Sequence, residues 1–79
     1  MKEHLSVSLE DLSEIFSEIT SKKIQISMDS AINNVDYWDS ITHIFLISAL
    51  ESKYGVNIPF ECIEKCQSAS GIIEVLRDL

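Results

Sequence analysis

Three segments of the chain place their apolar residues at the spacing of an α-helix, and this pattern limits what the chain can fold into. A surface helix buries one stripe of apolar residues and exposes polar residues on its other face. The apolar residues are Leu9, Leu12, Ile15, Phe16 and Ile19 in the first segment, Ile41, Ile44, Phe45, Leu46, Ile47, Ala49 and Leu50 in the second, and Ile72, Ile73, Val75, Leu76 and Leu79 in the third. The pattern predicts an all-α bundle.

We expect three main helices and one short helix around a single hydrophobic core. The residues expected to form this core, because each lies on the repeating apolar face of its helix, are Leu12, Phe16, Ile19, Leu46, Ile47, Leu50, Ile72 and Leu76. The chain has 79 residues, and a chain this short buries only about 60–65% of the surface that its unfolded form exposes. Residues 1–79 should therefore form one domain with a thin core.

Local signals indicate where the helices begin and end. Ser8 is a candidate N-cap with Asp11 three residues on, and Val7 and Leu12 stand where a hydrophobic staple would form. The second helix should run from about Ser40 to Tyr54 and stop at Gly55, because glycine most easily adopts the left-handed conformation that ends a helix.

The last part of the chain predicts two further helices. Pro59 fits the first turn of a short third helix that reaches about Cys66, since a proline there loses no hydrogen bond. Ser68 can cap the fourth helix.

Residues 20–39 predict a long loop, which is rare in a compact domain and usually functional. Ser, Asn and Asp are frequent here, and we expect its apolar residues, among them Ile24, Ile26 and Met28, to pin the loop across the helices. The acidic and amide residues could suggest a calcium loop, but the required glycine and final acid are missing.

Charge and composition exclude several classes of function. Thirteen acidic residues against six basic ones give a net charge of −7, which is the wrong sign for binding nucleic acid or an anionic membrane surface. No apolar run approaches the ~18 residues of a membrane span, and the N-terminus lacks a signal-peptide apolar stretch. We therefore expect a cytoplasmic protein, and a monomer.

The two cysteines, Cys62 and Cys66, predict neither a disulfide nor a metal site. Four residues apart, they fit one face of a helix, where a disulfide would strain the backbone. His4 and His43 lie far from them in sequence, and there is no second cysteine pair. We expect reduced thiols and no bound metal.

Ser40 is the strongest candidate for a functional residue, because it stands where the long loop meets the second helix. It could simply cap the helix. However, Asp39 precedes it, and seven of the ten residues from 41 to 50 are apolar, more than one buried stripe needs. A phosphate attached to Ser40 would be stabilised by the free N–H groups and the positive end of the helix dipole.

Two stretches of sequence resemble the acyl carrier proteins. They are residues 36–44, Asp-Tyr-Trp-Asp-Ser-Ile-Thr-His-Ile, and residues 49–59, Ala-Leu-Glu-Ser-Lys-Tyr-Gly-Val-Asn-Ile-Pro. In that family an Asp-Ser-Leu signature opens the second helix, which runs to an acidic-aromatic end followed by an Ile-Pro step. The resemblance extends over essentially the whole chain, including the long first loop and the short third helix.

The resemblance implies that Ser40 receives 4′-phosphopantetheine from coenzyme A through a phosphopantetheinyl transferase. The thiol of this arm would then hold an acyl or aminoacyl group as a thioester, passed between a loading enzyme and downstream synthase enzymes. Ser40 would be an acceptor and the chain not an enzyme. Asp39 would help the transferase to engage, and Ile41 stands where the family has leucine.

The second helix differs from that of the fatty-acid carriers, which is rich in acidic residues. Between Ser40 and Tyr54 the only acid is Glu51, and Lys53 nearly cancels it. The chain looks more like the discrete carriers of polyketide or nonribosomal-peptide systems, with fatty-acid synthesis as the alternative. The candidate partner-binding residues are Asp36, Trp38, Thr42, His43, Phe45 and Glu51. We expect Thr42, His43 and Phe45 to be outward or half-exposed, whereas Trp38 could instead cover the core.

The same residues also fit two other functions. Ser40 and His43 are three apart on a helix and could act as nucleophile and base, but a hydrolase also needs an orienting group, an oxyanion hole and a cleft. Alternatively, the apolar excess of residues 41–50 could make the chain a helical interaction module without any attached group.

Overall fold

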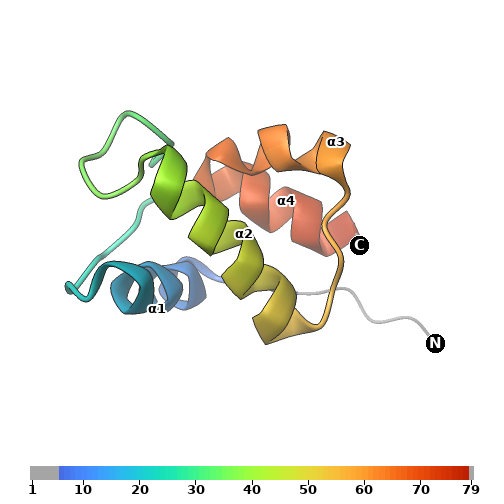
Figure 1. Ribbon diagram of the computed structural model, residues 1–79, viewed down its shortest axis with the longest axis horizontal. Helices are drawn as coiled ribbons and strands as arrows, with labels where there is room; N and C mark the ends of the chain where they lie inside the picture. The colour runs from blue at the N-terminus through green and yellow to red at the C-terminus, as the bar shows by residue number, and fades with distance from the viewer. Residues whose placement is uncertain (1–5, 79) are drawn as a thin grey trace.

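The computed structural model describes residues 6–78, which form an all-α bundle (Figure 1). Its elements are α1 (Leu9–Thr20), α2 (Ser40–Tyr54), α3 (Phe60–Ile63), the 3-10 helix η1 (Glu64–Gln67) and α4 (Ala69–Asp78). In Figure 1, α2 runs diagonally across the molecule, with α1 on one side of it and α3 and α4 on the other. None of the helices within these residues is long and apolar enough to cross a membrane. The predicted all-α bundle of three main helices and one short helix is confirmed.

Helix α1 begins at the predicted cap. The Ser8 hydroxyl accepts a hydrogen bond from the Asp11 N–H at 3.1 Å, and the Asp11 carboxylate accepts one from the Ser8 N–H at 3.0 Å. Together these bonds form a capping box. The bond donated by the Ser8 N–H lowers the pKa of Asp11, because it favours the charged carboxylate. Val7 and Leu12 are both buried, as the predicted staple requires.

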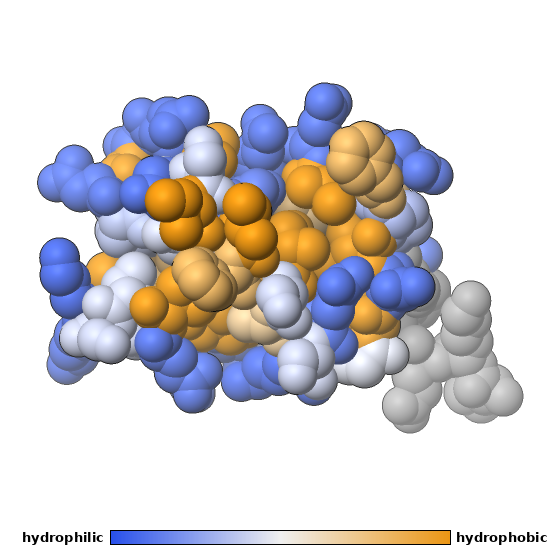
Figure 2. Space-filling view, viewed as in Figure 1, coloured by the Kyte–Doolittle hydropathy of each residue, from blue (hydrophilic) through white to orange (hydrophobic). Residues whose placement is uncertain are grey.

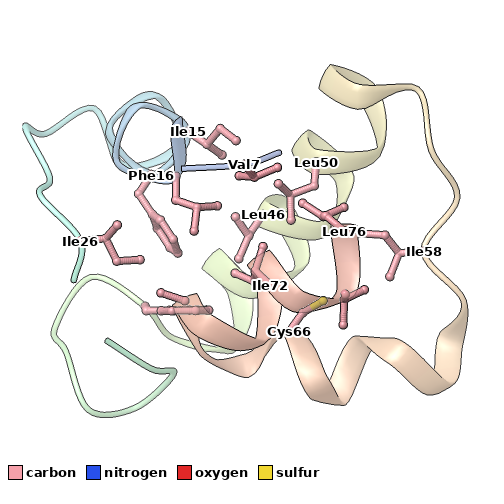
Figure 3. Close-up of a cluster of buried hydrophobic side chains, with 14 residues drawn as sticks. Val7, Ile15, Phe16, Ile26, Leu46, Leu50, Ile58, Cys66, Ile72 and Leu76 are labelled. Carbon is pink, nitrogen blue, oxygen red and sulfur yellow. The ribbon is translucent and has the colours of Figure 1, made fainter. Parts of the chain in front are cut away.

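Within residues 6–78, fourteen buried hydrophobic residues form one core (Figure 3). Six of the eight predicted core residues are fully buried, namely Leu12, Phe16, Leu46, Leu50, Ile72 and Leu76. Ile19 and Ile47 are only partly buried and pack against the others. Leu79, which the pattern places on the apolar face of the last helix, lies outside the described residues.

The first half of the long loop is held against α1 by serine hydroxyls. Ser17 Oγ accepts a hydrogen bond from the Ile24 N–H, and Ser13 Oγ accepts one from the Ile26 N–H, both at 2.9 Å. Each hydroxyl also donates to the carbonyl four residues earlier in α1. The loop is pinned as expected, with Ile26 buried, but Met28 is 49% exposed and takes no part in the pinning.

The second half of the loop is held by the junction between η1 and α4. The Ile32 N–H donates to the Gln67 carbonyl at 2.8 Å, and the Ala69 N–H donates to the Ser30 carbonyl at 2.9 Å. These backbone bonds fix the far end of the loop, from which the chain turns into α2.

The region before α4 differs in detail from its prediction. Pro59 precedes the third helix as its N-cap, and the α-helical part ends at Ile63, after which the chain continues as η1 through Cys66. Both cysteines are free. Ser68 Oγ accepts a hydrogen bond from the Gly71 N–H at 3.0 Å, which confirms the predicted cap of α4.

Candidate functional site

Ser40 is the first residue of α2 and is exposed to solvent. In Figure 1 this is the point where the long loop turns into the diagonal helix. Its hydroxyl makes no hydrogen bond with any other residue between 6 and 78, so the structure leaves the hydroxyl group accessible. The predicted position of Ser40 is confirmed, and so are the limits of α2, which ends at Gly55 with a φ of 62°.

Asp39, and not Ser40, caps α2. The Asp39 carboxylate accepts a hydrogen bond from the Thr42 N–H at 2.8 Å, and its carbonyl accepts one from the His43 N–H at 2.9 Å. The bond from Thr42 lowers the pKa of Asp39. The interpretation of Ser40 as a helix cap is therefore wrong. An N–H group that could have held a phosphate is also already taken by a carboxylate.

Trp38 lies in the core beside the site. Its side chain is fully buried, and its ring centroid lies 4.8 Å from that of Phe16. The indole Nε1–H donates a hydrogen bond to His43 Nδ1 at 3.1 Å. The prediction that Trp38 binds a partner is wrong, because no part of its side chain reaches the surface. The alternative, that it covers the core, is confirmed.

His43 is buried rather than outward or half-exposed, which corrects the expectation from sequence. Only 7% of the residue is exposed. Burial lowers the pKa of the imidazole, and the nearby backbone carbonyl of Ile63 acts in the opposite direction. Since Nδ1 accepts the bond from Trp38, the proton of the neutral ring lies on Nε2. This buried Nε2 has no hydrogen-bond partner among residues 6–78.

The remaining partner-binding candidates differ in exposure. Asp36 and Phe45 are exposed and Thr42 is half-buried. Glu51 is half-buried, and its carboxylate accepts a hydrogen bond from the Ile58 N–H at 2.9 Å, so it holds the turn after α2. Ile41, placed beside Ser40 by the signature, is 67% exposed.

Exposed hydrophobic side chains gather on one side of the molecule. Figure 2 shows hydrophobic surface over α2 and α3. We define the apolar face by its most exposed members, Ile41, Ile44, Phe45 and Phe60, which are between 58% and 86% exposed. The predicted excess of apolar surface on the second helix is confirmed. The helical periodicity of the sequence could not predict the large exposure of Phe60, because α3 has only four residues.

A groove lies between α2 and α3. It has a volume of about 270 Å³ and is lined by His43, Ile44, Ile47, Ser48, Glu51 and Ile63. Three isoleucines make it largely apolar, and His43 stands at the end that is nearest to Ser40 in the helix.

Comparisons of the chain with models of protein families, with curated proteins and with solved structures found no match.

Proposed function

We propose that the chain is an acyl or aminoacyl carrier whose Ser40 bears 4′-phosphopantetheine. The observation that carries this proposal is the exposed Ser40 hydroxyl, which stands free at the first turn of α2 beside the capping carboxylate of Asp39. An enzyme that modifies a serine needs such access. The resemblance of residues 36–59 to the carrier family supports the same assignment.

Ser40 would act as an acceptor that a separate transferase activates. The only described histidine, His43, has its Nδ1 engaged by Trp38 and its Nε2 buried, so residues 6–78 supply no accessible imidazole to deprotonate the hydroxyl. The proposal assigns the base, the metal and coenzyme A to the phosphopantetheinyl transferase. The attached thiol then supplies the chemistry of the carrier, because it binds acyl groups as thioesters.

The charge at the attachment point favours an arm that extends into solvent. The Asp39 carboxylate already accepts from the first turn of α2, and a phosphodiester on Ser40 adds a second negative charge beside it. Like charges at short distance repel. We expect this repulsion to keep the phosphate away from the helix end and the arm accessible to partner enzymes.

The apolar face is the proposed docking surface for these enzymes. It begins at Ile41, next to Ser40, and includes Phe45 on the following turn. A partner bound there would lie close to the arm. The weak acidic character of α2 favours polyketide or related secondary-metabolite systems, with fatty-acid synthesis as the alternative. We propose a monomeric cytoplasmic carrier that meets the transferase, a loading enzyme and downstream synthases in turn.

Mass spectrometry after incubation with coenzyme A and a broad-specificity phosphopantetheinyl transferase tests the proposal. The protein should gain the mass of one arm. Ser40→Ala should gain none, whereas Ser52→Ala, which removes another exposed serine of α2, should be modified as the unaltered chain is. An unmodified wild-type protein, or an arm on Ser40→Ala, would refute the carrier assignment.

The apolar face also supports a second candidate, an interaction module that binds a partner without any attached group. This function does not use the Ser40 hydroxyl. A partner recovered equally well with wild-type and Ser40→Ala protein, combined with failure of arm attachment, would favour the module over the carrier.

A further inference from the structure

Ser40 lies in a short junction that the chain crosses between the long loop and α2. We define the junction as residues 38–43, which run from the end of the loop into the helix. On the helical side, the Asp39 carbonyl accepts from the His43 N–H at 2.9 Å, and the Asp39 carboxylate accepts from the Thr42 N–H at 2.8 Å. These are the bonds of an ordinary helix start, and they fix the backbone that follows Ser40.

The side of the junction that precedes Ser40 is held differently. Asp39 is the N-cap and has an extended backbone, with a φ of −111° and a ψ of −175°, so Trp38 lies outside the helix. The Trp38 carbonyl accepts a hydrogen bond from the Asn33 N–H at 3.0 Å, which ties the residue to the loop. Its indole ties it to α2, because Nε1–H donates to His43 Nδ1 at 3.1 Å. This bond, the Trp38–His43 link, joins the two ends of the junction around Ser40.

The Trp38–His43 link is buried and is supported by a third ring. Trp38 is fully buried and His43 is 7% exposed. The ring centroid of Phe16 lies 4.8 Å from that of the indole, so α1 holds Trp38 in place as well. A buried N–H that loses its acceptor bears the full cost of desolvation, and a buried hydrogen bond therefore restrains the groups that make it. The link limits the movement of the backbone on both sides of Ser40.

Building on the proposed carrier function, we infer that His43 is a positioning residue, whose hydrogen bond with Trp38 holds the Ser40 backbone in the orientation that the transferase requires. In the transfer, a bond forms between Ser40 Oγ and the phosphorus that bears the pantetheine part of coenzyme A. The bond from that phosphorus to the bridging oxygen of the diphosphate breaks, and adenosine 3′,5′-bisphosphate leaves. The hydroxyl proton passes to the base of the transferase. His43 touches none of these atoms and acts only through the backbone of Ser40.

Orientation matters for this step because the attacking and leaving oxygens lie roughly in line at the phosphorus. A misplacement of about 1 Å can lower the rate of such a step about 100-fold. Docking of the transferase uses other residues, because Ile41 and Phe45 of the apolar face are exposed whereas the link lies in the core. Loss of the link should therefore lower the turnover number, kcat, of the transferase with this carrier and leave KM nearly unchanged.

Two substitutions of His43 separate the effect of the hydrogen bond from that of packing. His43→Asn places a side-chain oxygen near the position of Nδ1 and keeps an acceptor for the indole, although the smaller side chain leaves a gap. His43→Phe fills the space but offers no acceptor. Steady-state arm transfer would be measured at a temperature at which circular dichroism shows every variant to be folded. His43→Phe should lower kcat about tenfold and change KM less than about twofold, whereas His43→Asn should keep kcat within about threefold.

The order of the two variants decides between the hydrogen bond and packing. If His43→Asn is slower than His43→Phe, packing is the cause and the inference is overturned. Equal kcat values for the two variants and the unaltered protein would also overturn it. An unaltered protein that gains no arm would instead overturn the proposed function, and this inference with it.

The donor of the link provides an independent measurement. Trp38→Phe removes the indole N–H and should lower kcat as His43→Phe does. The double variant should have a kcat within about twofold of either single variant, because both changes break the same bond. Losses that multiply would contradict the inference. Val75→Ala is the control for lost stability, because Val75 is a buried residue of α4 outside the junction, and it should leave kcat and KM unchanged. An equal fall of kcat in this control would show that general destabilisation is the cause.

Nuclear magnetic resonance relaxation of the unmodified protein tests the link without the transferase. The order parameter of the Ser40 amide should be near the rigid value of about 0.85 in the unaltered protein and in His43→Asn. In His43→Phe it should fall toward about 0.6, the value typical of flexible backbone. An order parameter that does not change in His43→Phe would overturn the inference and leave the proposed function untouched.

Discussion

Trp38 donates a hydrogen bond from its indole nitrogen to Nδ1 of His43 at a distance of 3.1 Å. The two residues stand on either side of Asp39 and Ser40, so this bond joins the end of the long loop to the first turn of α2. Because Trp38 also packs on Phe16 of α1, the junction that presents Ser40 is anchored in the core. The exposed serine, the first residue of α2, is therefore flanked by two residues that are held in the core.

The assignment of the helix cap can be tested by stability. Asp39→Ala should lower the free energy of unfolding by about 1 kcal/mol, the usual cost of losing an N-cap. Ser40→Ala should change it by less than about 0.5 kcal/mol, because the hydroxyl makes no hydrogen bond within the described part of the chain. Denaturant unfolding of both variants measures the difference. A larger loss for Ser40→Ala than for Asp39→Ala would reverse the assignment.

The burial of His43 predicts a dependence of stability on pH. Its pKa in the folded protein lies below the ordinary value of 6.5, so the unfolded chain binds the proton first as pH falls. The free energy of unfolding should therefore be constant with respect to His43 above pH 6.5. It should fall as the pH drops below 6.5, until the lowered pKa of the folded protein is reached. The decline has a limit of about 1.4 kcal/mol per pH unit for one proton.

Protonation would also place a hydrogen on Nδ1, where Trp38 can only donate. The lowered pKa values of Asp11 and Asp39 affect stability in a different pH range, because the stabilisation that they give is lost only below the ordinary value of 3.8. Denaturant unfolding between pH 7 and pH 5 therefore isolates the histidine. His43→Phe should remove the slope in this range, and a slope that persists unchanged would show that another group causes it.

The orientation of α2 predicts that substitutions at neighbouring positions differ in their effect on the free energy of unfolding. Leu46→Ala and Leu50→Ala should each lower the free energy of unfolding by about 2–5 kcal/mol, because both side chains are fully buried. Such a loss is a large part of the roughly 5–15 kcal/mol that stabilises a typical domain. Ile44→Ala, at a site that is 69% exposed, should cost less than about 1 kcal/mol. Equal losses at positions 44 and 46 would mean that the helix is turned the other way.

The close approach of α4 to η1 makes Gly71 irreplaceable. A Cβ atom at this position would overlap the backbone carbonyl of Lys65, which cannot move aside as a flexible side chain can. Glycine to alanine inside a helix normally gains about 1 kcal/mol. Here we expect a loss of about 1–3 kcal/mol, the range for overpacking. A thermal melt that shows Gly71→Ala to be more stable than wild type would contradict this contact.

The ends of the helices could be predicted from sequence because their signals are local. Ser8 with Asp11, and Gly55 after Tyr54, lie within one turn of the bonds they make or the conformation they adopt. The long loop was also predictable, but not the Ser13 and Ser17 hydroxyls that hold it, because these bonds join residues seven or more apart.

The environment of His43 was not predictable for a different reason. α2 has apolar residues on most of its circumference, so its sequence does not show which face is buried. The side that holds His43 is chosen by Trp38, which lies outside the helix and bonds to the ring across the capping residue. Sequence also does not decide between Asp39 and Ser40 as the cap of α2, because aspartate and serine are both favoured at this position.

The last prediction concerns how partner enzymes recognise the proposed carrier. The apolar face begins at Ile41 beside the attachment point, and α2 has no acid in its first turn. Exposed charge pairs contribute only about 0–1 kcal/mol each and are screened by salt, whereas apolar burial is not. We therefore expect a cognate enzyme to bind this protein with little dependence on salt concentration. Phe45→Ala should weaken binding about tenfold or more, as is usual for a buried aromatic at an interface.

Titration of the enzyme from low to high salt, repeated with Phe45→Ala, measures both effects. Met28→Ala is the matched control, because Met28 is an exposed apolar residue that does not belong to the apolar face. It should leave the affinity unchanged. Affinity that collapses with salt while Phe45→Ala binds as well as wild type would show that the acidic residues, Asp36 and Asp39 among them, dominate docking. In that case the proposed difference in docking between this protein and the acid-rich fatty-acid carriers would be wrong. The apolar face would then have to be explained by another contact.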